Sequence, residues 1–426
     1  MFKLFPKMAL FAEQGDRRQP SSSDAQLKNT LSSRDAILSR VKILLVHEID
    51  YVNKPFFEFQ EFAEGLSNLG HQVTVLHVQE FNGQDAKKHN TIINMSGLQL
   101  PSVQIKLYST SFVVRGLLTR FLAVLEHLRL LIRIFISDTP DVVLSYSVPT
   151  SGVTVALLGR VFNVPVVHRA IDVSHLLRSK LLAPLVRLSE IAVFSLSDSV
   201  STHNEALRAY VRETPGLRKE VTIEYPPVYP VEISRKTEDQ TATNGLRIVF
   251  IGSLAHFTNL EGIMFSLSGK NGKSDIKLRI VGSGPKERKL KRLSHSLGLD
   301  ETIEFRGWKS REELSDELAW ADIGIVAFKQ NKLTNCALPH KAIEYLSAGL
   351  PVVSTQLEGA ASILGGIAGM HFVDSVSDIL ERCESLANNH QLGNVDSATV
   401  NRRFGREPTL REMEQMLRDV HKDRVK

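Results

Sequence analysis

The sequence predicts an α/β protein built from two doubly wound, Rossmann-like domains that face a cleft. Its 426 residues exceed what one hydrophobic core usually holds. Short apolar runs rich in β-branched residues alternate with helical patterns, as is typical of buried parallel strands joined by crossover helices. This alternation stops at a polar interval beyond the middle of the chain and then begins again, which indicates two domains of the same class.

The first half opens with a predicted strand at residues 41–46 (VKILLV). A helix is expected at 57–69, followed by Gly70, because a glycine commonly follows a helix at this position. A second strand is expected at 73–78. The same order recurs at 141–145, 150–162 and 164–168. The first half therefore predicts an open parallel sheet.

The second half repeats the pattern after a polar linker at residues 236–245. Strands are expected at 246–251, 277–281, 303–305, 323–327 and 351–354, and helices at 286–297, 311–320 and 341–348. The division of the chain is then a disordered lead-in at 1–40, a first domain at 41–235, a second domain at 246–400 and a C-terminal helix at 401–426. Ligands of such sheets bind beyond the carboxyl ends of the strands, so the loops that follow the strands are candidate sites.

Composition narrows the function. The formal charge is +5, but no block of Lys and Arg of the kind that binds nucleic acid occurs. Cys336 and Cys383 match neither a zinc site nor a redox pair, so two free thiols in a reducing compartment are expected. The apolar start of the chain ends at Glu13 and is too short for a secretory signal or a membrane span. We therefore expect a soluble cytoplasmic protein without a nucleic-acid partner.

Two glycine-bearing loops follow strands of the second half. They are Gly252-Ser253 after LRIVFI and Gly282-Ser283-Gly284 after KLRIV. Glycine lets backbone N–H groups approach a phosphate closely, and a helix N-terminus adds partial positive charge. The plainer interpretation is that both loops are tight turns between strand and helix. A dinucleotide fingerprint is not completed, because its third glycine position holds Glu287, and a Walker A loop is absent.

Residues 331–355, NKLTNCALPHKAIEYLSAGLPVVST, carry the strongest signal. Pro339 is placed to begin a helix, and Lys341 and Glu344 lie three residues apart on one face of its first turns. The ammonium suits a diphosphate, and the carboxylate can accept two hydrogen bonds from neighbouring ribose hydroxyls. The alternative is a surface ion pair, which contributes little. Spacing alone leaves both interpretations open.

The segment LPHKAIEYLSAGLPVVST resembles the donor site of glycosyltransferase family 4 and related enzymes of the GT-B architecture. The likeness extends to IVFIGSL, RIVGSGP, IEFRGW and ADIGIVAF in family order, over about residues 246–355. It is weaker over 41–211, in GHQVTVL, PDVVLSYS and NVPVVHRAID. The resemblance implies transfer of a sugar from a UDP- or GDP-sugar to a glycan or lipid-linked acceptor in bacterial surface polysaccharide biosynthesis. The nucleotide-sugar is then a co-substrate, and no cofactor is expected.

The resemblance also implies that Glu344 holds the donor ribose. Many family members carry another glutamate seven residues earlier, but this chain has Ala337 there. Contacts to the donor sugar are therefore expected from Asn335, Thr334 or His340.

Two cations of the family pattern are also missing. The arginine that usually follows the first glycine is Ser253, and the later lysine falls near Thr258 or Asn259. Diphosphate binding should then depend on Lys341 and on backbone N–H groups. Because the chain contains no Asp-x-Asp pair, the leaving group is expected to be stabilised without a metal ion. Whether the reaction retains or inverts the anomeric configuration stays open.

The run VVHRAID at 166–172 places three polar side chains at the end of a buried strand of the first half. They are His168, Arg169 and Asp172. In the expected architecture this half binds the acceptor, and Asp172 acts as a general base on its hydroxyl or only contacts it. The alternatives are a helix N-cap before 174–188 for Asp172 and purely structural contacts for His168 and Arg169.

Residues 112–136, FVVRGLLTRFLAVLEHLRLLIRIFI, predict a long helix with an unusual surface. At 100° per residue, four charged side chains fall within about 60° of one another: Arg115, Glu126, Arg129 and Arg133. The rest forms a wide apolar face, but the charges exclude an ordinary membrane span. The helix is either buried within the domain or rests on an anionic membrane. Lipid-linked acceptors, which the resemblance implies, favour the second interpretation.

Three functional hypotheses follow. The first is a glycosyltransferase, located in the cytoplasm and at the inner face of the membrane if 112–136 contacts lipid. The second is a sugar-nucleotide epimerase on the same fold, and the third is a non-catalytic GT-B-like binding subunit. The presence of both Lys341 and Glu344 favours an enzyme, whereas the missing glutamate at Ala337 keeps the third hypothesis open.

Overall fold

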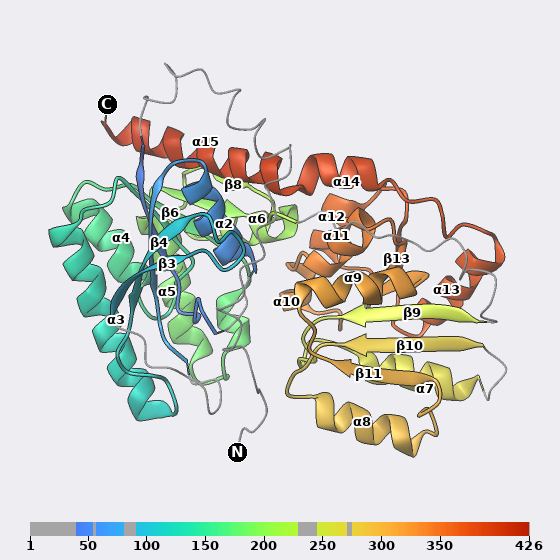
Figure 1. Ribbon diagram of the computed structural model, residues 1–426. Helices are drawn as coiled ribbons and strands as arrows, with labels where there is room; N and C mark the ends of the chain where they lie inside the picture. The colour runs from blue at the N-terminus through green and yellow to red at the C-terminus, as the bar shows by residue number, and fades with distance from the viewer. Residues whose placement is uncertain (1–39, 54–56, 81–90, 229–244, 271–274, 426) are drawn as a thin grey trace.

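The computed structural model describes residues 40–53, 57–80, 91–228, 245–270 and 275–425. Two α/β domains lie side by side, and the chain passes from the first to the second in the order of the sequence (Figure 1). The lead-in expected at 1–40 and the linker expected at 236–245 lie almost wholly outside the described residues.

The first domain contains an eight-stranded sheet in the order β3-β4-β2-β1-β5-β6-β7-β8. Its strands are β1 (Lys42–Val46), β2 (Gln72–His77), β3 (Ile92–Ser96), β4 (Gln104–Ser109), β5 (Val142–Ser145), β6 (Val166–Arg169), β7 (Ser199–Thr202) and β8 (Val221–Ile223). Only β3, at the edge, runs antiparallel to its neighbour. The other seven strands therefore present their carboxyl ends at one edge of the sheet.

Helices cover both faces of this sheet because successive side chains of a strand point to opposite faces. On one face, Ile43 and Leu45 of β1 pack in a core with α2 (Phe57–Asn68) and α15 (Arg406–Val425). On the other face, Leu44 and Val46 pack in a core with α3 (Leu117–Ser137) and α4 (Gly152–Val161). This second layer continues with α5 (Ala183–Leu196) and α6 (Glu205–Arg212).

The second domain contains a parallel six-stranded sheet in the order β11-β10-β9-β12-β13-β14. Its strands are β9 (Leu246–Ile251), β10 (Ile276–Val281), β11 (Ile303–Gly307), β12 (Ile323–Val326), β13 (Val352–Thr355) and β14 (Met370–Val373). Its helices are α7 (Leu260–Gly269), α8 (Glu287–Ser296), α9 (Arg311–Trp320), α10 (Lys332–Asn335), α11 (His340–Ser347), α12 (Glu358–Leu364), α13 (Asp378–Asn388) and α14 (Ser397–Phe404). The arrowheads of β9, β10 and β11 point toward the first domain (Figure 1). The ligand-binding edge of this sheet therefore faces the other domain.

Two expected elements differ from the structure. The helix expected at 174–188 is a short 3-10 turn, η2 (Ser174–Leu177), and α5 begins only at Ala183. The C-terminal helix expected at 401–426 is two helices that meet at Gly405.

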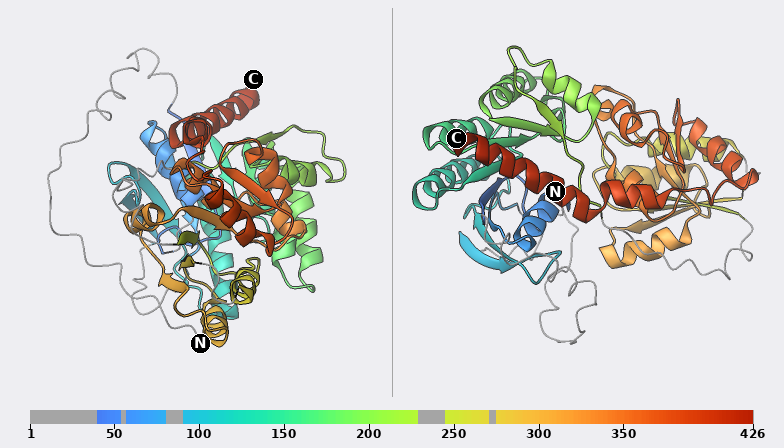
Figure 2. Two further views of the ribbon diagram at one scale, coloured as in Figure 1. Left: turned by 90° about the vertical axis from the view of Figure 1, so that its right-hand side faces the viewer. Right: turned by 90° about the horizontal axis from the view of Figure 1, so that it is seen from above.

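The final helix, α15, belongs by contact to the first domain. It crosses back from the second domain and lies along the first (Figure 2). Three of its side chains are buried in the same core as α2 and β1: Leu410, Met413 and Leu417. The first domain therefore includes a helix that follows the second domain in the sequence.

Both cysteines are buried and free, as expected. Burial raises the pKa of the Cys336 thiol to about 11 and raises that of Cys383 as well. Neither thiol is therefore a reactive thiolate at neutral pH.

Candidate active site

The two glycine loops of the second domain meet at the carboxyl ends of β9 and β10. Gly252 has φ +138 and Gly282 has φ +128, a region of backbone space that favours glycine. A Cβ atom on Gly282 would lie 2.0 Å from the carbonyl oxygen of Gly252, and one on Gly252 would lie 2.6 Å from Nζ of Lys341. The glycines therefore allow the two loops and the lysine to pack together.

Backbone contacts also hold the two loops together. The N–H of Leu254 donates to the carbonyl oxygen of Ser283 at 2.9 Å, and Gly284 lies against the backbone of Leu254. Ser253 is exposed. The loops are thus tight turns, as the plainer interpretation states, and they also leave Ser253 at the surface beside the lysine-bearing helix.

Lys341 occupies an unusual environment. Its ammonium lies 3.8 Å from the centroid of the Phe250 ring and 5.2 Å from that of Phe328. Among the described residues it has no hydrogen bond or ion pair, so the surface ion pair with Glu344 is not what the structure shows. Burial lowers the pKa of Lys341 to about 7, and nearby Glu344 only partly opposes this shift. A charge held this way is ready to pair with an incoming anion.

The position of Lys341 follows from how α11 is anchored. The N–H of Ile251, at the end of β9, donates to the hydroxyl of Tyr345 at 2.7 Å, and the Tyr345 ring is fully buried against Gly324. This contact fixes the first turns of α11 at the end of β9. Glu344 lies on the same turns, half-buried, and its carboxylate has no hydrogen bond among the described residues.

The three candidates for the donor sugar differ in availability. The Thr334 hydroxyl is buried and donates to the carbonyl oxygens of Lys329 and Asn331 within the capped start of α10, so it is engaged structurally. The amide of Asn335 donates to Glu358 at 3.2 Å. His340 is only partly exposed, at the start of α11. Asn335 and His340 remain candidates for sugar contacts.

The lysine that family members carry near Thr258 or Asn259 is partly replaced by another cation. Asn259 caps α7 by accepting a hydrogen bond from the N–H of Gly262, and Thr258 is buried. The ammonium of Lys286 donates to the carbonyl oxygen of Thr258 and pairs with Glu261. A cation thus reaches this place from another part of the chain, but a carboxylate already balances its charge.

Two residues expected on the acceptor side are buried in the structure. Arg169 is fully buried, and its guanidinium donates to Glu58 at 2.7 Å, to the Ser201 hydroxyl at 2.9 Å and to the Thr202 carbonyl at 2.7 Å. His168 is buried as well, and burial lowers its pKa to about 3, so the ring is neutral. Both side chains are buried at the carboxyl end of β6, and neither ring nitrogen of His168 has a hydrogen-bond partner among the described residues.

Asp172 lies just beyond β6 and does not cap a helix. It accepts a hydrogen bond from the Ser174 hydroxyl at 2.9 Å, whereas the N-cap residue of η2 is Val173, which makes no side-chain cap. Burial raises the pKa of Asp172, and the negative charges of Glu190 and Glu48 act in the same direction. A carboxylate with a raised pKa is a better proton acceptor for a hydroxyl.

Glu48 is a second carboxylate at the same edge of the sheet, and sequence reasoning missed it. It follows β1, and its Oε1 accepts hydrogen bonds from the Ser147 hydroxyl at 2.7 Å and the Thr150 N–H at 3.0 Å. The Ser147 hydroxyl in turn accepts from that of Ser151 at 2.9 Å, and Ser151 lies 3.1 Å from Nε2 of His127. This line of hydrogen bonds fixes the orientation of the Glu48 carboxylate.

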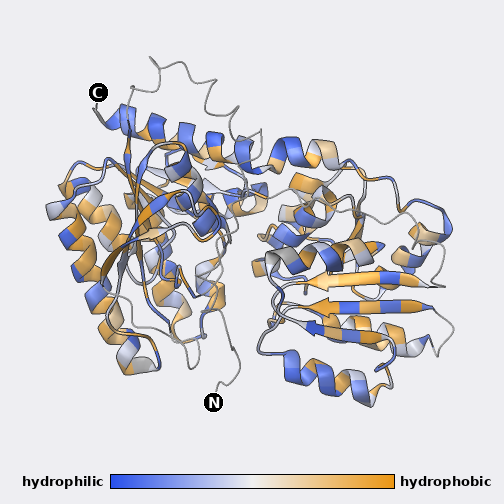
Figure 3. Ribbon diagram, in the orientation of Figure 1, coloured by the Kyte–Doolittle hydropathy of each residue, from blue (hydrophilic) through white to orange (hydrophobic). Residues whose placement is uncertain are grey.

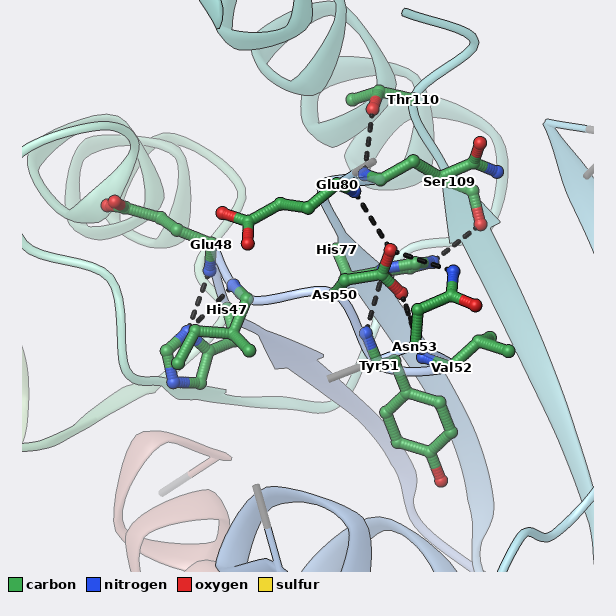
Figure 4. Close-up of polar contacts among 12 residues, drawn as sticks. His47, Glu48, Asp50, Tyr51, Val52, Asn53, His77, Glu80, Ser109 and Thr110 are labelled. Atoms are coloured by element: carbon green, nitrogen blue, oxygen red, sulfur yellow. Dashed lines mark hydrogen bonds and ion pairs between the residues drawn. The ribbon is translucent and has the colours of Figure 1, made fainter. Parts of the chain in front are cut away.

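His47 and Asp50 hold the loop that carries Glu48 (Figure 4). The Asp50 carboxylate accepts from the N–H groups of Val52, Asn53 and Glu80. Nδ1 of His47 accepts from the N–H of Glu48 at 2.8 Å. The only sequence signal for Glu48 was its place after the central strand.

The two domains touch through residues near both candidate sites. Nε2 of His340 lies 3.9 Å from Oε2 of Glu58, and the Asn204 amide donates to the carbonyl oxygen of Cys336 at 2.9 Å. Burial alone would raise the pKa of Glu58, but the Arg169 guanidinium lowers it below its ordinary value. An ionised carboxylate of the first domain therefore faces the start of α11.

Two parallel-sheet domains that meet at the carboxyl ends of their strands, with a lysine and a glutamate on the facing helix, define a glycosyltransferase of the GT-B class. The family model described as "Glycosyl transferases group 1" matches residues 245–389, and that described as "Glycosyl transferase 4-like domain" matches residues 58–226. The chain belongs to the group 1 glycosyltransferases, and it is an enzyme of this type.

Known proteins with the same architecture agree. Sucrose-phosphate synthase from Thermosynechococcus elongatus is similar with a TM-score of 0.72 and 15% identity, covering 89% of this chain and 99% of that chain. Anabaena Alr3699/HepE in complex with UDP is similar with a TM-score of 0.66 and 13% identity, covering 89% of this chain and 100% of that chain. At these identities the likeness shows the fold alone.

A match in sequence is found with the putative colanic acid biosynthesis glycosyltransferase WcaL of Salmonella typhimurium. It is 27% identical over 143 residues, which are 32% of this chain and 34% of that protein. The match thus spans about a third of the length of that relative.

Proposed function

We propose that the protein transfers a sugar from a UDP- or GDP-sugar to a glycan or lipid-linked acceptor in bacterial surface polysaccharide biosynthesis. One observation carries the proposal: the Lys341 ammonium lies beside Gly252 without an acidic partner among the described residues, and the Glu344 carboxylate lies one turn away. A cation that the protein does not neutralise, at the ligand-binding edge of a doubly wound sheet, suits a phosphate group.

The donor side then acts on the leaving group. The bond between the anomeric carbon and the diphosphate oxygen breaks, and the nucleoside diphosphate leaves with the bonding electrons. The Lys341 ammonium stabilises the negative charge that develops there, and the backbone N–H group of Ser253 adds to this effect, whereas that of Gly252 already donates to the carbonyl oxygen of Val281. Glu344 accepts hydrogen bonds from the ribose hydroxyls and so fixes the position of the donor.

The acceptor side receives the proton. The acceptor hydroxyl oxygen forms a bond to the anomeric carbon, and its proton passes to a carboxylate of the first domain. Asp172 and Glu48 are two carboxylates at this edge and are the candidates for this role. Asp172 is the better candidate because its pKa is raised, whereas Glu48 already accepts two hydrogen bonds.

Two relatives support the choice of substrates. HepE, which shares this fold, was crystallised in complex with UDP-glucose. WcaL is named as a putative glycosyltransferase of colanic acid biosynthesis. These names favour a nucleotide-sugar donor and a polysaccharide role for this chain.

The experiment is a panel of UDP- and GDP-sugars assayed by thermal shift, since a ligand of the folded state raises the melting temperature. One donor should raise it, and Lys341→Met and Glu344→Gln should each abolish the rise. Arg292→Gln, at an exposed position of α8 in the same domain, is the control. No rise with any donor, or an equal rise in the Lys341→Met variant, would contradict the proposed site. Release of nucleoside diphosphate that depends on acceptor separates transfer from epimerisation.

A further inference from the structure

The outer surface of the first domain is unusually apolar. It is formed by the helical layer of α3, α4 and α5, in which α4 contacts both of its neighbours. Apolar residues follow the outer side of α3 and α4 (Figure 3). On these two helices the exposed large apolar side chains are Leu118, Phe121, Leu125, Ile132, Ile136, Leu157 and Val161.

The helix α3 is apolar on two sides. Its inner side packs into the core of the domain through Leu130, Leu131, Ile134 and Phe135, which agrees with the interpretation of a helix buried within the domain. Its outer side nevertheless exposes Leu118 by 72% and Ile136 by 68%. Packing against the sheet therefore leaves part of the apolar surface of this helix exposed.

A second apolar segment, which the sequence analysis did not single out, adjoins this layer. It runs from η2 into the first turns of α5 and exposes six leucines: Leu176, Leu177, Leu181, Leu182, Leu185 and Leu188. Leu181 is 88% exposed. A concentration of this kind is rare on a surface that meets only water and marks an interaction site. We call η2, α5 and the outer sides of α3 and α4 together the outer face.

The exposed charges of the outer face have one sign. The exposed charged side chains of α3, α4, η2 and α5 and the turn between the last two are Arg120, Arg129, Arg133, Arg160, Arg178 and Lys180. Glu126, by contrast, is half-buried and accepts hydrogen bonds from the Ser111 N–H and hydroxyl. Glu190 is fully buried.

We propose that the outer face docks on an anionic membrane surface. Leucines surrounded by cations match the boundary between acyl chains and anionic headgroups. A second copy of this chain fits less well, because a two-fold contact would bring the same six cations against each other. Among the described residues no helix is long and apolar enough to cross a bilayer, and the docking proposed here is peripheral.

Membrane docking goes beyond the proposed function, and it bears on where the acceptor of that function would approach. The leucine segment begins four residues after Asp172, whose carboxylate accepts from Ser174 at the start of η2. A membrane that contacts η2 would therefore lie next to the acceptor side. Of the two acceptor classes, this arrangement favours the lipid-linked one.

The test is sedimentation of the full chain with vesicles of phosphatidylcholine, with and without phosphatidylglycerol, at low and high salt. The protein should sediment with the anionic vesicles, and binding should weaken as salt screens the charges. Leu181→Gln/Leu185→Gln should reduce binding at least about tenfold, because two exposed leucines lose their burial in the interface. Arg178→Gln/Lys180→Gln should reduce binding about tenfold on anionic vesicles only.

Matched controls lie on the second domain. Phe265→Gln removes an exposed apolar side chain there, and Arg288→Gln/Arg292→Gln removes two exposed cations. Both controls should bind like the wild type, and melting temperatures of all variants should be equal because every replaced side chain is exposed. Absence of sedimentation with either vesicle, or sedimentation that the outer-face variants leave unchanged, would overturn the proposal. So would a dimer in analytical ultracentrifugation that Leu181→Gln/Leu185→Gln dissociates. None of these results depends on sugar transfer, so failure of docking and failure of the proposed function are distinguishable.

Discussion

Lys341 of the second domain and Arg169 of the first look alike in the sequence, since each follows a histidine and lies near the end of a strand or the start of a helix. The structure treats them in opposite ways. The Arg169 guanidinium is fully buried and paired with Glu58, whereas the Lys341 ammonium lies over the Phe250 ring and has no ion pair among the described residues. A cation already neutralised by the protein is part of the framework, and a cation left without an anion is available to a ligand.

The comparison predicts its largest effect at Arg169. Arg169→Leu should lower the free energy of unfolding by about 3–5 kcal/mol, because it leaves the buried Glu58 carboxylate without its partner. Urea unfolding measures this loss, and Glu58→Gln combined with Arg169→Leu should recover part of it. Arg292→Leu, at an exposed position, should stay within about 0.5 kcal/mol of the wild type. Normal stability with lost transfer would instead return Arg169 to the acceptor site.

The variants Asp172→Asn and Glu48→Gln test which carboxylate of the acceptor side acts as the general base. Loss of the general base should lower the rate of transfer about 100-fold, while donor affinity, a property of the other domain, stays unchanged. We expect the larger loss for Asp172→Asn because its pKa is raised. Steady-state rates and donor binding should be measured on the same preparations. A loss of donor affinity in either variant would show that the two sides are not separate.

The low pKa of Lys341 predicts a pH dependence of donor binding. In the free protein burial lowers this pKa to about 7, and a diphosphate beside the ammonium must raise it. Between these two values, binding takes up a proton, so affinity should fall as pH rises above about 7, by at most tenfold per pH unit. Calorimetry in buffers of different ionisation enthalpy measures the proton directly. Lys341→Met should abolish the uptake, and an unchanged uptake would place the titrating group elsewhere.

A smaller effect is expected at the contact between the domains. His340→Gln removes a partly exposed imidazole that lies 3.9 Å from the Glu58 carboxylate. Contacts of this kind contribute less than about 1 kcal/mol to the free energy of unfolding. Stability should therefore hardly change, whereas the Michaelis constant for the donor should rise if His340 contacts the sugar. An unchanged Michaelis constant would leave Asn335 as the remaining candidate.

For removal of metal ions we expect no effect on transfer. Because the sequence has no Asp-x-Asp pair and Lys341 can stabilise the leaving group, transfer should survive EDTA. If EDTA abolished transfer and magnesium or manganese restored it, Lys341 would not stabilise the leaving group alone.

The parts that sequence predicted well depend on short-range pattern. The strand β9 and the helix α9 occupy the predicted ranges, because a strand period, a glycine turn and a capped helix start are all local signals. The placement of Lys341 near Gly252 followed from the order of strand, loop and helix in a doubly wound sheet.

The parts that were missed depend on pairing across long stretches of chain. Glu58 lies 111 residues before Arg169, and nothing between them indicates that they meet. Glu48 had no motif around it, and its hydrogen bonds come from Ser147 and Thr150 about a hundred residues later. The leucines near Leu181 were assigned to a helix, but Leu181 and Leu182 lie in the exposed turn between η2 and α5, because α5 begins only at Ala183.

The return of α15 to the first domain affects how the protein is made. The buried side chains of Leu410, Met413 and Leu417 complete a core whose other members lie before residue 168. A ribosome needs on the order of tens of seconds to add the intervening residues at typical rates. During that interval the first domain carries an open apolar groove, so its final fold is reached only after the whole second domain has left the ribosome.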